Sequence, residues 1–241
     1  MEKRSLEEVN SAVDEKAEDE FLSGSFDDLE AEIGHARKRL RRFCLIMDAT
    51  SSMSGCWTQA IEAMHYVAEN IFDRARVPVE LKVIAYRDHC DGSGILDQSY
   101  FSNDRAYLKD YISNIRCYGG GDEPEAIKVG LEAALTEVEG LSRVVLLGDA
   151  PDHHEQGQDA IIPALELGKI QAPIFAIYLR LSAKASFEAI AKASGGRAYG
   201  FDDFKGGMGD IITTILAQDK LLGIEYIPKT IEGKKIKEEL G

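Results

Sequence analysis

Short, almost entirely apolar runs alternate with amphipathic stretches over most of the chain, starting near residue 43. Such apolar runs are typical of strands that are buried on both faces of a parallel sheet. We expect strands at 43–48, 79–88, 95–101, 143–149, 173–179 and 196–201, with 95–101 as a short edge strand. We expect helices at 53–75, 104–115, 122–138, 154–168, 183–194 and 203–219. This alternation predicts an α/β fold, a doubly wound, Rossmann-like and mostly parallel sheet with helices on both faces.

Charge is distributed unevenly along the chain. Residues 1–32 hold 12 acidic and 3 basic side chains, and a basic block, RKRLRR, follows at 37–42. A weak helical periodicity runs through the acidic stretch. It is either a solvated arm or a segment that folds onto the basic block or onto a partner. We therefore expect three segments: an acidic helical arm with a basic linker at 1–39, an α/β domain at 40–222, and a charged C-terminal tail at 223–241 that frays.

The overall composition excludes several classes of protein. With 28 basic and 42 acidic residues the formal net charge is −14, so nucleic-acid phosphates and anionic lipid repel the chain. The apolar runs are shorter than the roughly 18 residues that a membrane-spanning helix requires. The charged N-terminus has no apolar core of a secretory signal. We expect a cytoplasmic protein whose 4 cysteines are reduced thiols, with no direct contact to nucleic acid or membrane.

Oxygen-bearing side chains follow several of the predicted strands at the end where ligands bind in such sheets. Asp48, Thr50 and Ser52 follow the first strand, and their alternation allows all three to project to one side. Asp149 follows the strand at 143–149, and Asp122 follows a run of three glycines. Carboxylate and hydroxyl oxygens suit a hard cation, so we expect these five residues to bind Mg²⁺ or Mn²⁺.

Asp122 also has an ordinary structural interpretation. Asp122-x-x-Glu125 fits a helix-capping box, with Pro124 in the first turn. One carboxylate can cap a helix and still face a metal, directly or through water. Asp88, at the end of the second strand, is either a residue that supports the metal ligands without binding the ion itself, or a turn residue.

Other polar and aromatic side chains near this rim are expected to have ordinary roles. Trp57 is a contact anchor for a partner or a helix-packing residue. The histidines of the rim are expected to be exposed loop residues: His89, His153 and His154. A soft-metal site is not favoured, because the spacing of its candidate ligands matches no standard pattern: Cys56, Cys90 and Cys117 with His153.

Three motifs in this order, LIMDATSSM, GGGDEPEA and LLGDAPDH, resemble a von Willebrand factor A domain over roughly residues 40–220. YRDH, GGGDEPEA and GDAP are most similar to its microbial and alpha-kinase-linked branch. The resemblance implies a metal-ion-dependent adhesion site in which Asp48, Thr50 and Ser52 form the first motif, with Thr50 in place of a serine. Asp149 stands for the late aspartate. Asp122 falls where the family usually has a threonine, so a third carboxylate would strengthen metal retention and weaken the attraction of an acidic partner.

The resemblance favours a non-catalytic protein–protein interaction module. In such a module, Mg²⁺ with an open coordination position accepts a glutamate or aspartate from a partner protein. Microbial relatives work beside ATPases or in multi-subunit assemblies, so an ATPase or another complex subunit is the expected partner. The alternative is an enzyme, a haloacid-dehalogenase-like phosphatase with Asp48 as nucleophile and Mg²⁺ as phosphate clamp. Thr50 argues against it, because such phosphatases place an acid–base aspartate at that position.

Overall fold

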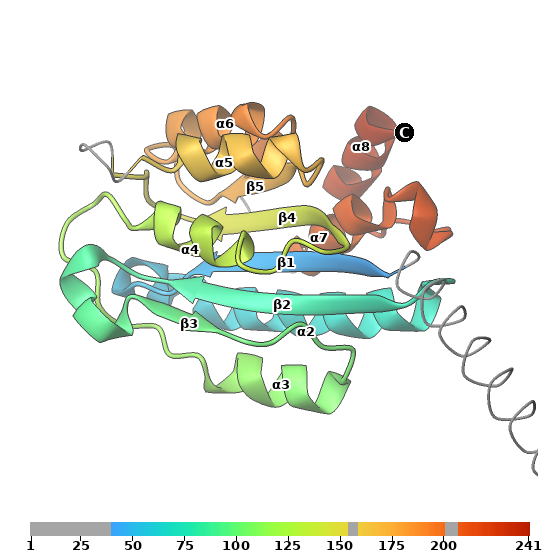
Figure 1. Ribbon diagram of the computed structural model, residues 1–241, viewed down its shortest axis with the longest axis horizontal. Helices are drawn as coiled ribbons and strands as arrows, with labels where there is room; N and C mark the ends of the chain where they lie inside the picture. The colour runs from blue at the N-terminus through green and yellow to red at the C-terminus, as the bar shows by residue number, and fades with distance from the viewer. Residues whose placement is uncertain (1–39, 154–158, 201–206) are drawn as a thin grey trace, which may run out of the picture. The chain divides into compact units, whose positions relative to one another are not determined.

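The computed structural model describes residues 40–153, 159–200 and 207–241 and contains a six-stranded sheet flanked by helices (Figure 1). The predicted acidic arm lies outside these residues. The strands are β1 (Arg41–Asp48), β2 (Val79–Tyr86), β3 (Leu96–Gln98), β4 (Leu141–Gly148), β5 (Ile174–Tyr178) and β6 (Arg197–Gly200). The α-helices are α2 (Trp57–Arg74), α3 (Arg105–Asn114), α4 (Ile127–Ala134), α5 (Ile161–Lys169), α6 (Lys184–Ala193), α7 (Met208–Ala217) and α8 (Ile231–Leu240). Short 3₁₀ turns are η1 (Ser51–Gly55), η2 (His89–Gly94) and η3 (Lys220–Leu222).

The strand order β3-β2-β1-β4-β5-β6 is that of a doubly wound sheet. All neighbouring strands are parallel except β2 and β3, which are antiparallel. This confirms the predicted fold class and the short edge strand. The chain moves outward from β1 to β2 and then returns to place β4 on the other side of β1. The order therefore reverses between β1 and β4, the point at which open α/β sheets bind ligands.

Two hydrophobic cores cover the two faces of the sheet, because successive side chains of a buried strand point to opposite sides. In β1, Phe43, Leu45 and Met47 pack in the core that includes α2, α3, α7 and α8. Cys44 and Ile46 pack in the other core, against α4, α5 and α6. Figure 1 shows α5 and α6 on one side of the sheet and α2 on the other. Because both faces are covered, the ends of the strands are where polar side chains can form a site.

Several helix boundaries differ from those predicted. The helix expected at 122–138 comprises only Ile127–Ala134, and its N-cap residue is Ala126, which makes no side-chain cap. The prediction that Asp122 caps this helix is therefore wrong. The backbone N–H of Glu125 instead donates to Pro151 O at 2.9 Å, which ties this loop to the segment after β4. The helix expected at 53–75 begins as the turn η1 and continues as α2.

The C-terminal segment is packed and does not fray, contrary to the sequence prediction. Tyr226 is 3% exposed and Ile236 is 5% exposed, and Ile236 belongs to the core around α7. Asp210 of α7 is the polar anchor: its carboxylate accepts hydrogen bonds from Tyr226 Oη at 2.7 Å and from Thr230 Oγ1 at 2.6 Å. The backbone N–H groups of Lys229 and Thr230 also donate to it. A segment rich in lysine and glutamate is thus fixed through one buried carboxylate.

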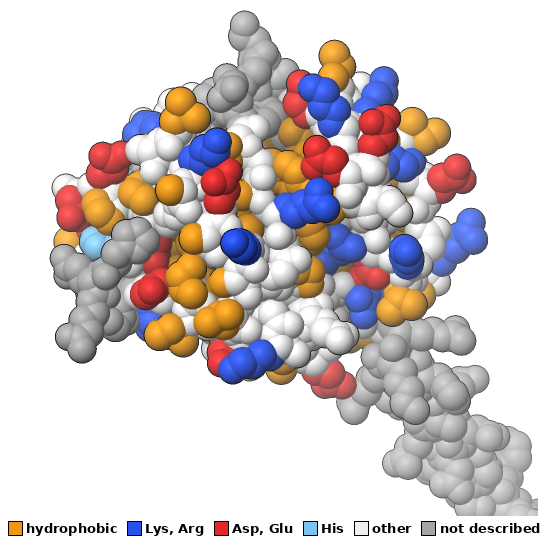
Figure 2. Space-filling model, turned by 90° about the horizontal axis from the view of Figure 1, so that it is seen from above, with side chains coloured by type: hydrophobic (Ala, Val, Ile, Leu, Met, Phe, Trp, Pro, Cys, Tyr) orange, Lys and Arg blue, Asp and Glu red, His pale blue; other side chains and the backbone are white. Residues whose placement is uncertain are grey.

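The surface over α5 and α6 carries interspersed acidic, basic and hydrophobic side chains (Figure 2). Exposed apolar side chains on and next to α5 include Ile162, Leu165 and Ile170. Among the described residues, no helix is both long and apolar enough to cross a membrane. All 4 cysteines are free thiols: Cys44 and Cys56 are buried, Cys117 is partly buried and Cys90 is exposed.

Candidate metal centre

The loops that follow β1 and β4 meet at the switch point of the sheet. Met47 pairs with Leu147 in register, so Asp48 at the end of β1 lies beside Gly148 at the end of β4. Gly148 is required there, since a Cβ at that position would lie 2.7 Å from Tyr86 Oη and 3.2 Å from Asp48 Cβ. The close approach of the two strand ends brings Asp149 into the same small volume as Asp48.

Four of the five predicted ligands lie in one continuous row of polar contacts. Thr50 donates to Asp48 Oδ1 from its backbone N at 2.8 Å and from its hydroxyl at 2.7 Å. The hydroxyls of Thr50 and Ser52 are 2.9 Å apart, and Ser52 Oγ donates to Asp149 Oδ1 at 2.7 Å. The structure therefore brings Asp48, Thr50, Ser52 and Asp149 together. No hydrogen bond between described residues links Asp122 to these four.

This row of contacts leaves one buried oxygen without a partner. Asp48 is fully buried, and its Oδ2 atom accepts no hydrogen bond from the described residues. Burial raises the pKa of Asp48 to about 7, although the bonds from Thr50 act in the opposite direction. A buried carboxylate oxygen without a donor is costly unless a cation or a proton compensates its charge.

Glu125 is a further acidic residue of this site, which the sequence analysis missed. It is 2% exposed, and its Oε2 atom also has no hydrogen-bond partner among the described residues. Burial, together with the nearby charges of Asp48 and Asp88, raises the pKa of Glu125 to about 9. A Cβ on Gly120 would lie 3.1 Å from Thr50 Cβ and 3.2 Å from Glu125 Oε1, so the glycine loop passes directly over both side chains.

Arg180 supplies a positive charge at the edge of the site and was also missed. It follows β5, and its Nη2 atom lies 3.0 Å from Asp149 Oδ2. The same atom donates to Ser52 O at 3.2 Å. Asp149 is 3% exposed, whereas the Arg180 side chain is 54% exposed. No local motif marks this residue, because its role depends on β5 lying next to β4.

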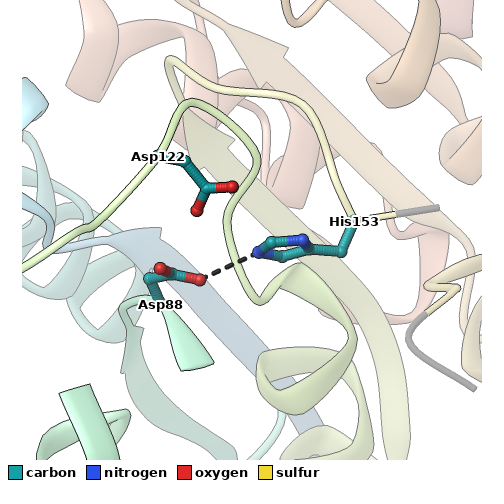
Figure 3. Close-up of side chains that lie close together, drawn as sticks. All are labelled: Asp88, Asp122 and His153. Atoms are coloured by element: carbon teal, nitrogen blue, oxygen red, sulfur yellow. Dashed lines mark hydrogen bonds and ion pairs between the residues drawn. The ribbon is translucent and has the colours of Figure 1, made fainter. Parts of the chain in front are cut away.

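Asp122 lies in a second group, with Asp88 and His153 (Figure 3). His153 Nε2 is 2.9 Å from Asp88 Oδ1. Burial acts to raise the pKa of Asp88, but hydrogen bonds from His153, Cys90 and His89 outweigh it and hold the pKa below its ordinary value. The prediction of an exposed loop histidine is wrong for His153, which is 9% exposed. His154 lies outside the described residues.

The three cysteines that follow or flank the strand ends have different surroundings: Cys56 is buried, Cys117 is partly buried and Cys90 is exposed. Cys56 Sγ donates to Met53 O three residues before it, and Cys117 Sγ donates to the distant Thr50 O. Cys90 Sγ hydrogen-bonds to Asp88, the partner of His153. Trp57 is partly buried and packs against the core around α2.

Comparison with known proteins identifies the family. The family model for the von Willebrand factor A domain matches residues 42–203. A putative ariadne-like RING finger protein of Acanthamoeba polyphaga mimivirus is 33% identical over 111 residues, which are 46% of this chain and 11% of that protein. The chain thus spans about a tenth of this curated relative.

Solved structures agree with the fold. The von Willebrand factor type A protein from Catenulispora acidiphila is 16% identical with a TM-score of 0.52, over 73% of this chain and 43% of that one. Proximal thread matrix protein 1 from the mussel byssus was solved with a zinc-occupied metal-ion-dependent adhesion site. It is 22% identical with a TM-score of 0.51, and the match covers 68% of this chain and 42% of that one. From the match over residues 42–203 and the doubly wound sheet, we conclude that this chain belongs to the von Willebrand factor A domain family.

Proposed function

We propose that this protein is a non-catalytic interaction module that binds Mg²⁺, or Mn²⁺, through Asp48, Thr50, Ser52 and Asp149 and uses the ion to hold an acidic side chain of a partner protein. The observation that carries this proposal is the row of contacting oxygen side chains from Asp149 through Ser52 and Thr50 to Asp48, whose Oδ2 atom has no partner among the described residues. Four ligand side chains already lie within contact of one another, so little ordering is required when the ion binds.

The donor set fits a hard divalent cation. It consists of carboxylate and hydroxyl oxygens only, which Mg²⁺ and Mn²⁺ prefer, whereas nitrogen and sulfur ligands favour zinc. Zinc in the mussel protein's site supports divalent metal binding at this position of the fold. Glu125 would face the same ion, in place of the role predicted for Asp122. When bound, the ion supplies a positive charge that an incoming oxygen ligand can contact.

Charge balance permits an acidic partner group. Asp48, Glu125 and Asp149 carry −3 when ionised, and Mg²⁺ with Arg180 carries +3. A partner carboxylate therefore meets a formally neutral site, and it gains direct contact with the ion in surroundings drier than bulk water. Ser51 beside the site is exposed and Ser52 is partly buried, so the site reaches solvent on this side.

The partner we propose is a protein that presents a glutamate or aspartate, such as an ATPase or another subunit of a multi-subunit complex. Membership of the von Willebrand factor A family supports this role, since the family commonly mediates protein–protein interaction. The family match does not favour the phosphatase alternative.

A metal-dependent capture experiment tests the proposal. Immobilised wild-type protein and the Asp48→Asn variant are incubated with lysate of the native cell in Mg²⁺ or in EDTA, and captured proteins are quantified by mass spectrometry. We expect at least one protein that the wild type retains in Mg²⁺ and that is lost both in EDTA and with Asp48→Asn.

The matched control is Ser51→Ala, which alters an exposed serine next to the site and should retain the same protein. Acidic residues of the captured protein are then replaced by their amides, and one replacement should abolish capture. Capture that is equal in Mg²⁺ and EDTA and unaffected by Asp48→Asn contradicts the proposed function.

A further inference from the structure

A second cluster of ligand-type side chains lies in the loops around the first. Asp88 follows β2, Asp122 lies in the glycine-rich loop before α4, and His153 follows β4. One ligand atom of each lies within 4.8 Å of the other two, and Figure 3 shows the three side chains converging. We propose that these residues form a separate site for a divalent transition-metal ion, Zn²⁺ in the first instance, that is distinct from the all-oxygen site at Asp48.

The spacing of the cluster suits one ion. At bond lengths of about 2.1 Å, two ligand atoms of a tetrahedral or octahedral ion are roughly 3.0–3.4 Å apart. His153 Nε2 and Asp88 Oδ1 are 2.9 Å apart, so these two ligands need to move only slightly to admit the ion. The carboxylate of Asp122 is exposed and can close the remaining gap by rotation of its side chain. Water completes the coordination.

The two buried ligands are already held in place. Asp88 Oδ1 accepts a hydrogen bond from His89 N at 2.6 Å, and Asp91 Oδ2 accepts one from Asp88 N at 3.1 Å, so the start of η2 is fixed on both sides. His153 N donates to Glu125 O at 3.4 Å, which ties its backbone to the glycine-rich loop. Ligands fixed by surrounding hydrogen bonds lose little conformational freedom when they bind a metal.

The charge around the cluster is unbalanced without a cation. Asp88, Asp91 and Asp122 carry three negative charges, and His153 supplies at most one positive charge. Within the part of the chain that the structure describes, no lysine or arginine forms an ion pair with any of these three aspartates. A divalent ion that displaces the proton between His153 and Asp88 neutralises two of these charges. His89 stands beside the cluster, with its ring centroid 5.1 Å from that of His153 and its Nε2 atom unpartnered among the described residues.

The donor set separates the two sites chemically. An imidazole with two carboxylates suits Zn²⁺, whereas Mg²⁺ prefers oxygen ligands alone. The glycine-rich loop runs between the two clusters. A Cβ on Gly120 would meet Thr50 and Glu125 of the first site, and a Cβ on Gly121 would lie 3.1 Å from Asp88 Oδ2 of the second. An ion at the second site would fix this loop, and with it the position of Glu125.

Zinc binding by single-residue variants tests the proposal. Zn²⁺ affinity is measured by competition with a chromogenic chelator in the wild type, Asp122→Asn, His153→Gln and the matched control Glu123→Gln. Glu123 is exposed, lies in the same loop and carries the same charge, but it does not belong to the cluster. Asp122→Asn and His153→Gln should each lower the affinity of one Zn²⁺ site by more than about 100-fold. Even the loss of a residue that only hydrogen-bonds a metal ligand lowers metal affinity about 10–100-fold. Glu123→Gln should leave this site within about twofold of the wild type.

Zinc-edge X-ray absorption on the Asp48→Ala variant identifies the ligands without relying on the first site. We expect a histidine signal that disappears when His153→Gln is added. Asp122 is exposed, so its substitution leaves the fold intact and keeps the experiment informative if His153→Gln does not fold. If Asp122→Asn and Glu123→Gln bind Zn²⁺ equally, and the spectrum of the Asp48→Ala variant lacks histidine, the cluster is only a hydrogen-bonded His–Asp pair and the proposal is overturned.

Discussion

Removal of the Arg180 side chain should tighten metal binding, although Arg180 stabilises the metal-free site. Its guanidinium lies 3.0 Å from Asp149 Oδ2, while Ser52 bonds to the other oxygen of that carboxylate. If the ion binds one oxygen of the Asp149 carboxylate at about 2.1 Å while the guanidinium contacts the other oxygen, the ion and the guanidinium are about 5.5 Å apart. For charges of +2 and +1 at this distance, the repulsion is about 1.5–3 kcal/mol at an effective dielectric constant of roughly 40–80.

The exposed Arg180 side chain can swing away from the ion and avoid part of this repulsion. We therefore expect Arg180→Ala to lower the Kd for Mg²⁺ by about tenfold, which corresponds to about 1.4 kcal/mol. The assay is isothermal titration calorimetry of wild type, Arg180→Ala, Arg180→Lys and Lys184→Ala. Arg180→Lys retains the charge and should stay near the wild type, as should Lys184→Ala, which removes an exposed lysine at the start of α6. Unchanged or weaker Mg²⁺ binding by Arg180→Ala would refute the placement of the ion beside Asp149.

Three further substitutions test other parts of the structure. Glu125→Gln removes a buried carboxyl beside Thr50 that can ionise next to a bound ion, so it should weaken Mg²⁺ binding by about tenfold in the calorimetric titration. The exposed Glu123→Gln should not weaken it, and equal effects would exclude Glu125 from the site. Gly148→Ala places a Cβ 2.7 Å from Tyr86 Oη and should cost about 1–3 kcal/mol in a denaturant titration, so an unchanged midpoint would contradict the close packing of β1 and β4. Asp210→Asn weakens the bonds that hold the C-terminal segment and should cost about 2 kcal/mol at pH 7, with Glu232→Gln as the exposed control. These bonds hold the pKa of Asp210 below its ordinary value, so its contribution is present at neutral pH and is lost as the pH falls through that lowered pKa. The difference in thermal stability between wild type and variant should therefore shrink in acid, and a constant difference would contradict this role.

The first cluster could be predicted from the sequence because its geometry is local. Asp48, Thr50 and Ser52 lie within five residues at the end of a buried strand, and Asp149 directly follows another. Once a parallel sheet is inferred from the apolar runs, the adjacent ends of its strands bring these side chains together. The structure adds the hydrogen bonds that connect them.

The remaining residues of the rim could not be predicted in the same way. Asp122-x-x-Glu125 has the pattern of a capping box, but Glu125 pairs with Asp152 as an isolated β-bridge and the helix begins later. That long-range pairing turns Glu125 toward Thr50 and leaves Asp122 near Asp88 and His153. The burial of His153 depends on the same loop. Neither contact has a signal in the local spacing of residues.

The C-terminal segment shows a related limit of composition. Its alternating lysines and glutamates indicate a solvated tail, and the sequence analysis therefore predicted fraying. The structure instead anchors it on Asp210, a buried residue of the mostly apolar helix α7. A single buried carboxylate that accepts several hydrogen bonds can hold a segment in place, even when the segment's polar composition indicates a solvated tail.

The most direct test of the central claim is a Mg²⁺ titration of two neighbouring serine variants. Ser52→Ala removes the hydroxyl that connects Thr50 to Asp149, whereas Ser51→Ala removes an exposed hydroxyl one residue away. Both proteins should fold with similar melting temperatures in EDTA. We predict that calorimetry detects one Mg²⁺ site with wild-type affinity in Ser51→Ala and a loss of at least about tenfold in Ser52→Ala. Equal Mg²⁺ affinity in the two variants would contradict the assignment of the metal site.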